Sequence, residues 1–171
     1  MAENIVLIGL MGAGKTTVGK ILAENLDRTF IDSDELIEKR AKMTINEIFA
    51  KFGEEYFRNL EEEVLADISA KSGLVISTGG GAVQREDNIL NLKKNGVLFY
   101  LNASSEVLFE RIKNETDRPL LKNDNPLETL KNLLKKREKF YFKADFVIDT
   151  NNKDYNDVAE EIIRKLENYE K

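Results

Sequence analysis

Residues 4–20 decide the fold, and their sequence is NIVLIGLMGAGKTTVGK. The run 4–9 is apolar enough to be a buried strand, and a segment of helical character begins near residue 14. Between them, residues 9–16 match G-x-x-x-x-G-K-[ST], a pattern whose glycines let successive backbone N–H groups face an anion at a helix N-terminus. The stretch predicts a phosphate-binding loop between a strand and a helix. The alternative is a glycine-rich turn that binds nothing.

Outward from this loop, short apolar runs alternate with longer segments of helical period. Strands are expected at 4–9, 29–32, 74–78, 97–101 and 146–149. Helices are expected near 14–25, 34–41, 44–51, 54–71, 86–94, 104–113, 126–142 and 155–169. Most of the strands are apolar on both faces, which a parallel sheet covered by helices requires. The pattern predicts one α/β layered domain over the 171 residues.

The composition excludes several kinds of site. The chain contains no Cys and no His, which excludes a disulfide framework, a thiolate zinc site, a cysteine nucleophile and an imidazole-based triad. Acid–base chemistry must fall to Asp, Glu, Lys, Tyr or water. A net charge of -5 argues against generic nucleic-acid binding, so an anionic ligand must be held by local positive charge.

The hydropathy pattern argues against a membrane protein. The longest run of apolar and Gly residues, 5–14, is well short of the roughly 18 residues of a membrane span. Residues 1–4 do not begin an export signal, so we expect a cytoplasmic protein. No long exposed apolar helix demands a partner, and we therefore expect a monomer.

A pair of carboxylates, Asp32 and Asp34, follows the second expected strand, at the sheet edge where open α/β folds bind ligands. Alternate strand residues point to the same side, so both side chains can share one cleft. Beside a phosphate loop, the nearer carboxylate can hold the Mg²⁺ shell through water while the farther one faces an acceptor hydroxyl. Alternatively, either Asp only caps the helix that follows.

Two expected helices carry charges on their apolar faces. Glu61 lies within the apolar stripe of the helix near 54–71, with Arg58 three positions earlier at its edge. Glu61 could fix the Arg58 guanidinium for bidentate capture of a carboxylate or phosphate, or the two could form a structural ion pair. Arg137 projects onto the apolar face of the helix near 126–142, where it needs either a carboxylate of the protein or an anionic ligand.

Two loops complete the candidate site. Gly79, Gly80 and Gly81 directly follow the expected strand 74–78, where glycine permits positive φ and a close approach of backbone to a ligand, or simply a sharp turn. The polar stretch 113–125 predicts a mobile loop. Its Arg118 could swing over the phosphates and neutralise charge in the transition state, or it could only be solvated.

Taken in order, these segments resemble the shikimate kinase family. The matching segments are GLMGAGKTTVGK at 9–20, FIDSD at 30–34, Arg58, STGGG at 77–81, DRPLL at 117–121 and REKFY at 137–141. The resemblance covers nearly the whole chain. It implies a P-loop fold of the nucleoside-monophosphate-kinase-like type, with a five-stranded parallel sheet flanked by helices. The implied reaction transfers the γ-phosphoryl group of ATP to the 3-hydroxyl of shikimate, with Mg²⁺, on the route to chorismate and the aromatic amino acids.

The resemblance also implies roles for individual residues. The nucleotide side would comprise Gly12, Ala13, Gly14, Lys15, Thr16, Thr17, Arg111 and Arg118, with Thr16 and Asp32 at Mg²⁺. The shikimate side would comprise Asp34, Arg58, Glu61, Gly79, Gly80, Gly81 and Arg137. Lys15, Asp34 and Arg118 would be catalytic. Arg58 and Arg137 would bind the substrate carboxylate. Residues 33–61 would form the shikimate-binding segment and 113–125 the lid. The loop 151–153 would lie on the adenine side, although it lacks a proline that some family members carry.

Two other functions stay open from the sequence. A P-loop kinase of another polyhydroxylated acid, such as gluconate, would share the phosphate loop but has no reason to need two inward arginines beside a triple glycine. A nucleotide-dependent switch would bind ATP and turn over nothing.

Overall fold

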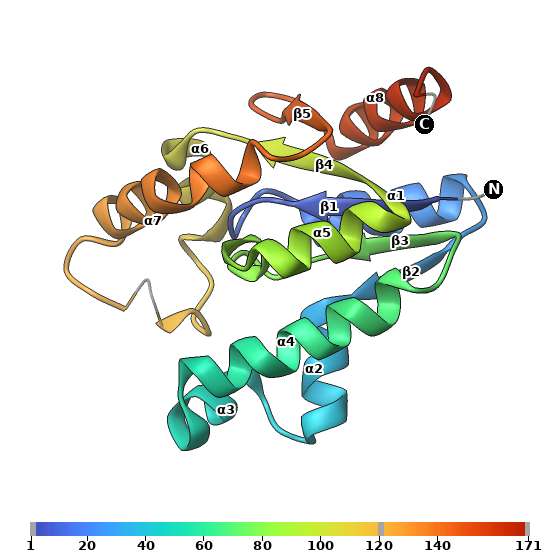
Figure 1. Ribbon diagram of the computed structural model, residues 1–171. Helices are drawn as coiled ribbons and strands as arrows, with labels where there is room; N and C mark the ends of the chain where they lie inside the picture. The colour runs from blue at the N-terminus through green and yellow to red at the C-terminus, as the bar shows by residue number, and fades with distance from the viewer. Residues whose placement is uncertain (1–2, 120–121, 170–171) are drawn as a thin grey trace.

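The alternating apolar runs and helical segments form a twisted parallel sheet with helices on both of its faces (Figure 1). The computed structural model describes residues 3–119 and 122–169. In these residues the strands are β1 (Asn4–Ile8), β2 (Thr29–Asp32), β3 (Leu74–Ser77), β4 (Gly96–Asn102) and β5 (Phe146–Asp149). The helices are α1 (Lys15–Asn25), α2 (Ser33–Ala41), α3 (Ile45–Phe52), α4 (Glu54–Ser69), α5 (Glu86–Lys94), α6 (Ser105–Ile112), α7 (Pro126–Tyr141) and α8 (Tyr155–Glu167), with a short 3₁₀ helix, η1 (Ala82–Gln84).

The described strands form one sheet in the order β2-β3-β1-β4-β5, and every neighbouring pair is parallel. β1 lies in the middle, where Ile5 is in register with Val75 of β3 and Val97 of β4. The carboxyl ends of β1, β2 and β3 therefore meet at one edge of the sheet. This confirms the predicted α/β fold with five parallel strands, and the ends of the expected strands and helices differ by at most two residues from those observed.

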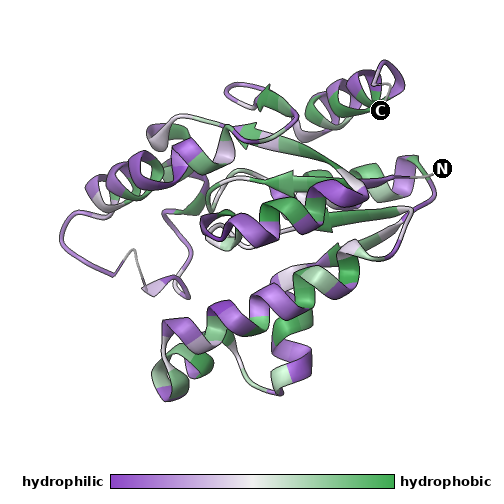
Figure 2. Ribbon diagram, in the orientation of Figure 1, coloured by the Kyte–Doolittle hydropathy of each residue, from purple (hydrophilic) through white to green (hydrophobic). Residues whose placement is uncertain are grey.

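The main core lies between the sheet and its helices. Ile5, Val6, Leu7 and Ile8 of β1 have no exposed surface, as expected for a central strand covered on both faces. α1 packs against α8 on one face, whereas α5 packs against α4 and β4 on the other. Figure 2 shows apolar strands beside helices that are apolar on one side only. None of the helices in the described part of the chain is both long and apolar enough to span a membrane.

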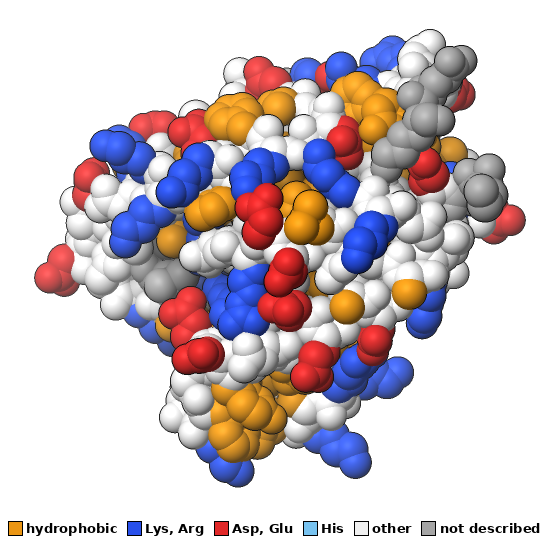
Figure 3. All heavy atoms as spheres, viewed as in Figure 1, with side chains coloured by type: hydrophobic (Ala, Val, Ile, Leu, Met, Phe, Trp, Pro, Cys, Tyr) orange, Lys and Arg blue, Asp and Glu red, His pale blue; other side chains and the backbone are white. Residues whose placement is uncertain are grey.

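Residues 33–69 form α2, α3 and α4, which lie together at the β2 side of the sheet (Figure 1). They enclose a small core of their own, formed by Ile37, Ile48, Phe57 and Val64. A capping box between Thr44 and Glu47 begins α3. Hydrophobic side chains are exposed over this part of the surface, as Figure 3 shows.

Candidate active site

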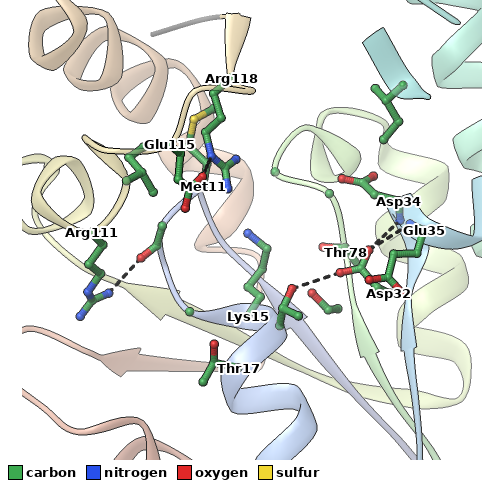
Figure 4. Close-up of a pocket in the computed structure, with 18 of the residues that line it drawn as sticks. Met11, Lys15, Thr17, Asp32, Asp34, Glu35, Thr78, Arg111, Glu115 and Arg118 are labelled. Atoms are coloured by element: carbon green, nitrogen blue, oxygen red, sulfur yellow. Dashed lines mark hydrogen bonds and ion pairs between the residues drawn. The ribbon is translucent and has the colours of Figure 1, made fainter. Parts of the chain in front are cut away.

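A cavity of about 410 Å³ lies at the carboxyl edge of the sheet. It is lined by the loop after β1, the end of β2, the start of α2 and the first two glycines after β3. The last residues of α6 and residues that follow it also line the cavity. Figure 4 shows Lys15 between Asp32 and Asp34 on one side and Met11 and Arg118 on the other. Residues far apart in the sequence thus surround one hollow.

The loop after β1 begins α1 without a side-chain cap. Gly12 and Gly14 have φ of 81° and 92°, a region that favours glycine. Lys15 Nζ donates to the carbonyls of Gly9 at 2.6 Å and Leu10 at 3.1 Å. Burial lowers the pKa of Lys15 to about 8; nearby Asp34 opposes this shift, and Arg118 adds to it. The loop therefore combines free helix N–H groups with a partly desolvated cation, as anion binding requires.

Asp32 is the N-cap of α2, and its second carboxylate oxygen accepts a hydrogen bond from the phosphate loop. Its Oδ1 accepts from the backbone N–H groups of Asp34 at 2.9 Å and Glu35 at 3.3 Å, so it caps α2. Its Oδ2 accepts from the Thr16 hydroxyl at 3.1 Å. The helix cap therefore also fixes the carboxylate beside the hydroxyl of the phosphate loop.

Asp34 is not the cap of α2, so that alternative is wrong for this residue. Its Oδ1 is buried and has no hydrogen-bond partner in the described residues. Burial, followed by the negative charge of Asp32, raises the pKa of Asp34 to about 6, against the attraction of Lys15 and Arg58. A buried carboxylate oxygen without a donor is costly unless a ligand supplies one.

The predicted pairing of Arg58 and Glu61 is confirmed. Arg58 Nη1 donates to both carboxylate oxygens of Glu61, at 3.0 and 2.7 Å, and Glu54 lies 3.5 Å from Nη2. Glu61 has no exposed surface, and its burial raises its pKa to about 7 although Arg58 opposes the shift. The guanidinium is therefore held in one place by a side chain that cannot reach solvent.

Arg137 on α7 has a different environment. Its Nε is buried with no hydrogen-bond partner, and no ion pair joins it to a carboxylate within the described ranges. Of the two partners considered from the sequence, a carboxylate of the protein is thus not the one observed. A buried guanidinium nitrogen of this kind favours an anionic ligand.

The three glycines after β3 each lie against a different charged side chain. A Cβ at Gly79 would be 2.7 Å from Oδ1 of Asp34, one at Gly80 would be 3.3 Å from Nη1 of Arg137, and one at Gly81 would be 2.7 Å from Cζ of Arg58. None of the three has positive φ, so of the two properties of glycine considered from the sequence only the close approach applies here. Glycine is needed here because a Cβ would occupy the space of these side chains. Its absence allows Asp34, Arg58 and Arg137 to surround one loop.

The residues expected near the nucleotide lie at the other side of the cavity. Arg118 lines the cavity and is paired with Glu115. Arg111 donates to the carbonyls of Gly12 at 3.1 Å and Thr150 at 2.9 Å, so it joins the phosphate loop to the end of β5. Of the predicted lid, Leu120 and Leu121 lie outside the described residues.

Sequence reasoning missed three residues of this region. The ring of Tyr155 lies on the phosphate loop, where a Cβ at Gly14 would be 2.6 Å from its Cε1, and the Arg111 guanidinium lies 5.7 Å from the ring centre. Ser33 accepts from the N–H of Gly79 at 3.2 Å. The Tyr141 hydroxyl donates to the carbonyl of Gly80 at 2.6 Å. Of the three, only Tyr141 could have been found from the sequence, because its hydroxyl lies on the apolar face of the same helix as Arg137, four residues further on.

A glycine-rich loop with Lys15 and Thr16 follows the central strand and faces, across one cavity, an aspartate with a buried carboxylate oxygen; this arrangement defines a P-loop kinase. Comparison with known proteins agrees: the model of the shikimate kinase family matches residues 11–167. The shikimate kinases of Thermodesulfovibrio yellowstonii and Thermoanaerobacter pseudethanolicus are 54% and 48% identical to the chain. The alignments cover 96% and 95% of this chain, respectively, and 95% of each relative.

A solved structure of shikimate kinase from Acinetobacter baumannii in complex with shikimate has a TM-score of 0.94 and 42% identity. The match covers 100% of this chain and 97% of that one. The chain belongs to the shikimate kinase family and is an ATP-dependent kinase. The resemblance inferred from the sequence motifs is confirmed.

Proposed function

We propose that the cavity and the triple glycine together hold two anions, ATP at the phosphate loop and shikimate between Asp34, Arg58 and Arg137. The observation that carries this proposal is the arrangement around Gly79, Gly80 and Gly81, where a carboxylate and two guanidinium groups from α2, α4 and α7 meet. Asp34 and Arg137 also lie close enough to Lys15 to affect its pKa, which Asp34 raises and Arg137 lowers. A phosphoryl group held by Lys15 would thus lie beside the acceptor.

On the nucleotide side, backbone N–H groups of residues 12–17 bind the phosphates, and Lys15 contacts the oxygens of the group being transferred. Arg118 lies on the far side of the same cavity and neutralises charge as the lid closes. Arg111 and Tyr155 offer a guanidinium and an aromatic ring on the base side.

The residues present suit Mg²⁺. The Thr16 hydroxyl and the Asp32 carboxylate lie 3.1 Å apart and provide oxygen donors, which Mg²⁺ prefers, and it usually takes its other ligands from phosphates and water. No cluster of three or more metal-binding side chains occurs in residues 3–119 and 122–169, which fits a metal shared with a nucleotide. When bound, Mg²⁺ would neutralise charge on the β- and γ-phosphates.

On the shikimate side, Arg58 and Arg137 bind the substrate carboxylate, with Arg58 held in position by Glu61. This role gives the buried Nε of Arg137 a hydrogen-bond acceptor, which no group in residues 3–119 and 122–169 supplies. Because this contact is made equally in ground and transition states, the two arginines contribute mainly to the shikimate KM.

Asp34 accepts a hydrogen bond from the 3-hydroxyl of shikimate and receives its proton as the oxygen attacks the γ-phosphorus. Phosphoryl transfer is loose, so alignment contributes more than base strength. A pKa of about 6 leaves Asp34 mostly ionised at neutral pH. The products are shikimate 3-phosphate and ADP. The cytoplasmic location, the monomeric state and the boundaries of the lid stay predictions from the sequence.

A coupled assay of ADP release tests this function against its alternatives. ADP release should depend on shikimate, and gluconate and other sugar acids at equal concentration should not replace it. Stimulation by gluconate alone would support the sugar-acid kinase, whereas nucleotide binding without release under any acid would support the switch.

A further inference from the structure

The backbone of the triple glycine is held by side chains that take no part in the proposed chemistry. Tyr141 lies on α7 four residues after Arg137, and its side chain is fully buried. Its hydroxyl donates to the carbonyl oxygen of Gly80 at 2.6 Å. Ser33, which precedes the loop in the sequence and lies at the start of α2, accepts a hydrogen bond from the N–H of Gly79 at 3.2 Å. The loop is therefore fixed from both α2 and α7.

Because peptides are planar, a hydrogen bond to one carbonyl also fixes the direction of the N–H group in the same peptide. The C=O and N–H of a planar trans peptide point opposite ways. The Gly79 carbonyl accepts from Ala82 N–H at 3.1 Å, which fixes the direction of the Gly80 N–H. In the next peptide, the bond from Tyr141 to the Gly80 carbonyl fixes the direction of the Gly81 N–H. Neither of these N–H groups has a hydrogen-bond partner within the described part of the chain.

Each of these two glycines lies against an arginine. Gly80 is next to Arg137 and Gly81 is next to Arg58, close enough that a Cβ on either would crowd the guanidinium. Oriented backbone N–H groups beside guanidinium groups form a site for a carboxylate. The peptide that Tyr141 holds therefore belongs to the part of the site that would receive the acid group of the substrate.

Tyr141 is itself rigidly placed. Its ring stacks on that of Tyr100, with 5.0 Å between ring centres and 22° between planes. Burial raises the pKa of Tyr141 to about 12, so the hydroxyl stays protonated and remains a donor at neutral pH. The Tyr100 hydroxyl, in contrast, donates to Asn102 Oδ1 at 3.0 Å, and within the described residues it forms no hydrogen bond with the glycine loop.

We propose that Tyr141 is a positioning residue for shikimate, which fixes the Gly80–Gly81 peptide and ties it to the helix that carries Arg137. The proposal rests on the assignment of shikimate to this pocket. It predicts a defect in the binding of the acid substrate and not in the phosphoryl-transfer step, because Tyr141 acts on the carboxylate side alone.

The test replaces one hydroxyl at a time. Tyr141→Phe should raise the shikimate KM about 5- to 20-fold, the order expected for one buried hydrogen bond, with kcat and the ATP KM within about twofold. Tyr100→Phe is the matched control, since it removes a hydroxyl from the neighbouring buried ring, and it should leave all three constants unchanged. An unchanged shikimate KM in Tyr141→Phe, or an equal rise in both variants, would overturn the proposal.

A second measurement does not depend on catalysis. In ¹⁵N relaxation of the substrate-free protein, the amide of Gly81 should lose order in Tyr141→Phe and keep it in Tyr100→Phe. If the unaltered protein released no ADP with shikimate, the proposed function would fail, and relaxation would still decide whether Tyr141 fixes the loop. Equal order parameters in both variants and the unaltered protein would refute that role.

Discussion

Replacing each of the three glycines by alanine in turn should produce three different kinetic defects. None of them has positive φ, so alanine introduces no backbone strain and acts only through the space that its Cβ occupies. At Gly81 the Cβ would lie 2.7 Å from Cζ of Arg58, whereas carbon atoms prefer about 3.5–4.0 Å. Arg58 must then move by about 1 Å.

That movement sets the size of the effect. Arg58 is held by two charge-assisted bonds to the buried Glu61, and hydrogen bonds of this kind contribute about 1.5–3 kcal/mol each. Losing one of them, or the equivalent contact with substrate, corresponds to a rise of roughly 10- to 100-fold in the shikimate KM for Gly81→Ala. The kcat should change little.

The other two glycines provide the comparison. In Gly79→Ala the Cβ would lie 2.7 Å from Oδ1 of Asp34, so the displaced carboxylate should lower kcat by about 10- to 100-fold. In Gly80→Ala the 3.3 Å contact with Nη1 of Arg137 requires only a small shift, and we expect less than about a threefold rise in the shikimate KM.

Steady-state kinetics with both substrates varied, together with melting temperatures for each variant, would separate these effects from unfolding. Three variants with the same kinetic defect would refute the reasoning. So would a Gly81→Ala variant with an unchanged shikimate KM.

Further predictions concern the charged groups. Lys15→Ala should lower kcat by about 10²- to 10³-fold with the shikimate KM within about twofold, because Lys15 acts on the transferred group; a change confined to the KM would contradict this. Arg137→Ala should raise the shikimate KM about 10- to 100-fold, and an unchanged KM would mean that its buried guanidinium serves only the fold. Since burial raises the pKa of Asp34 to about 6, the carboxylate is protonated as the pH falls through that value, and kcat/KM should decline below about pH 6. Asp34→Asn should abolish that acidic limb and lower kcat severely, with ATP binding by calorimetry preserved; wild-type activity that stays level well below pH 6 would remove Asp34 from this role.

Much of the fold was predictable because its signals are local. Strands apolar on both faces predict a covered parallel sheet, and the phosphate loop fixes which strand leads to the site. The pairing of Arg58 with Glu61 was predictable for the same reason, since three residues along a helix place two side chains side by side.

What the sequence did not reveal depends on contacts between distant segments. Three glycines are needed because Asp34, Arg58 and Arg137, from three different helices, occupy the space where their Cβ atoms would be. The bond from Tyr141 to Gly80 joins residues 61 positions apart, and a tyrosine in an apolar stripe is indistinguishable from an ordinary core residue. The sequence offered Asp32 as either a helix cap or a metal-side carboxylate. The structure shows that one oxygen caps α2 while the other, which accepts from Thr16, stays available for the proposed metal role.

The most direct test of the whole arrangement is a crystal structure with shikimate, Mg²⁺ and a non-hydrolysable ATP analogue. The shikimate carboxylate should lie within hydrogen-bond distance of both Arg58 and Arg137, with the 3-hydroxyl at Asp34 and the γ-phosphate beside Lys15. A shikimate carboxylate bound away from both arginines, or a ring hydroxyl out of reach of Asp34, would contradict the account.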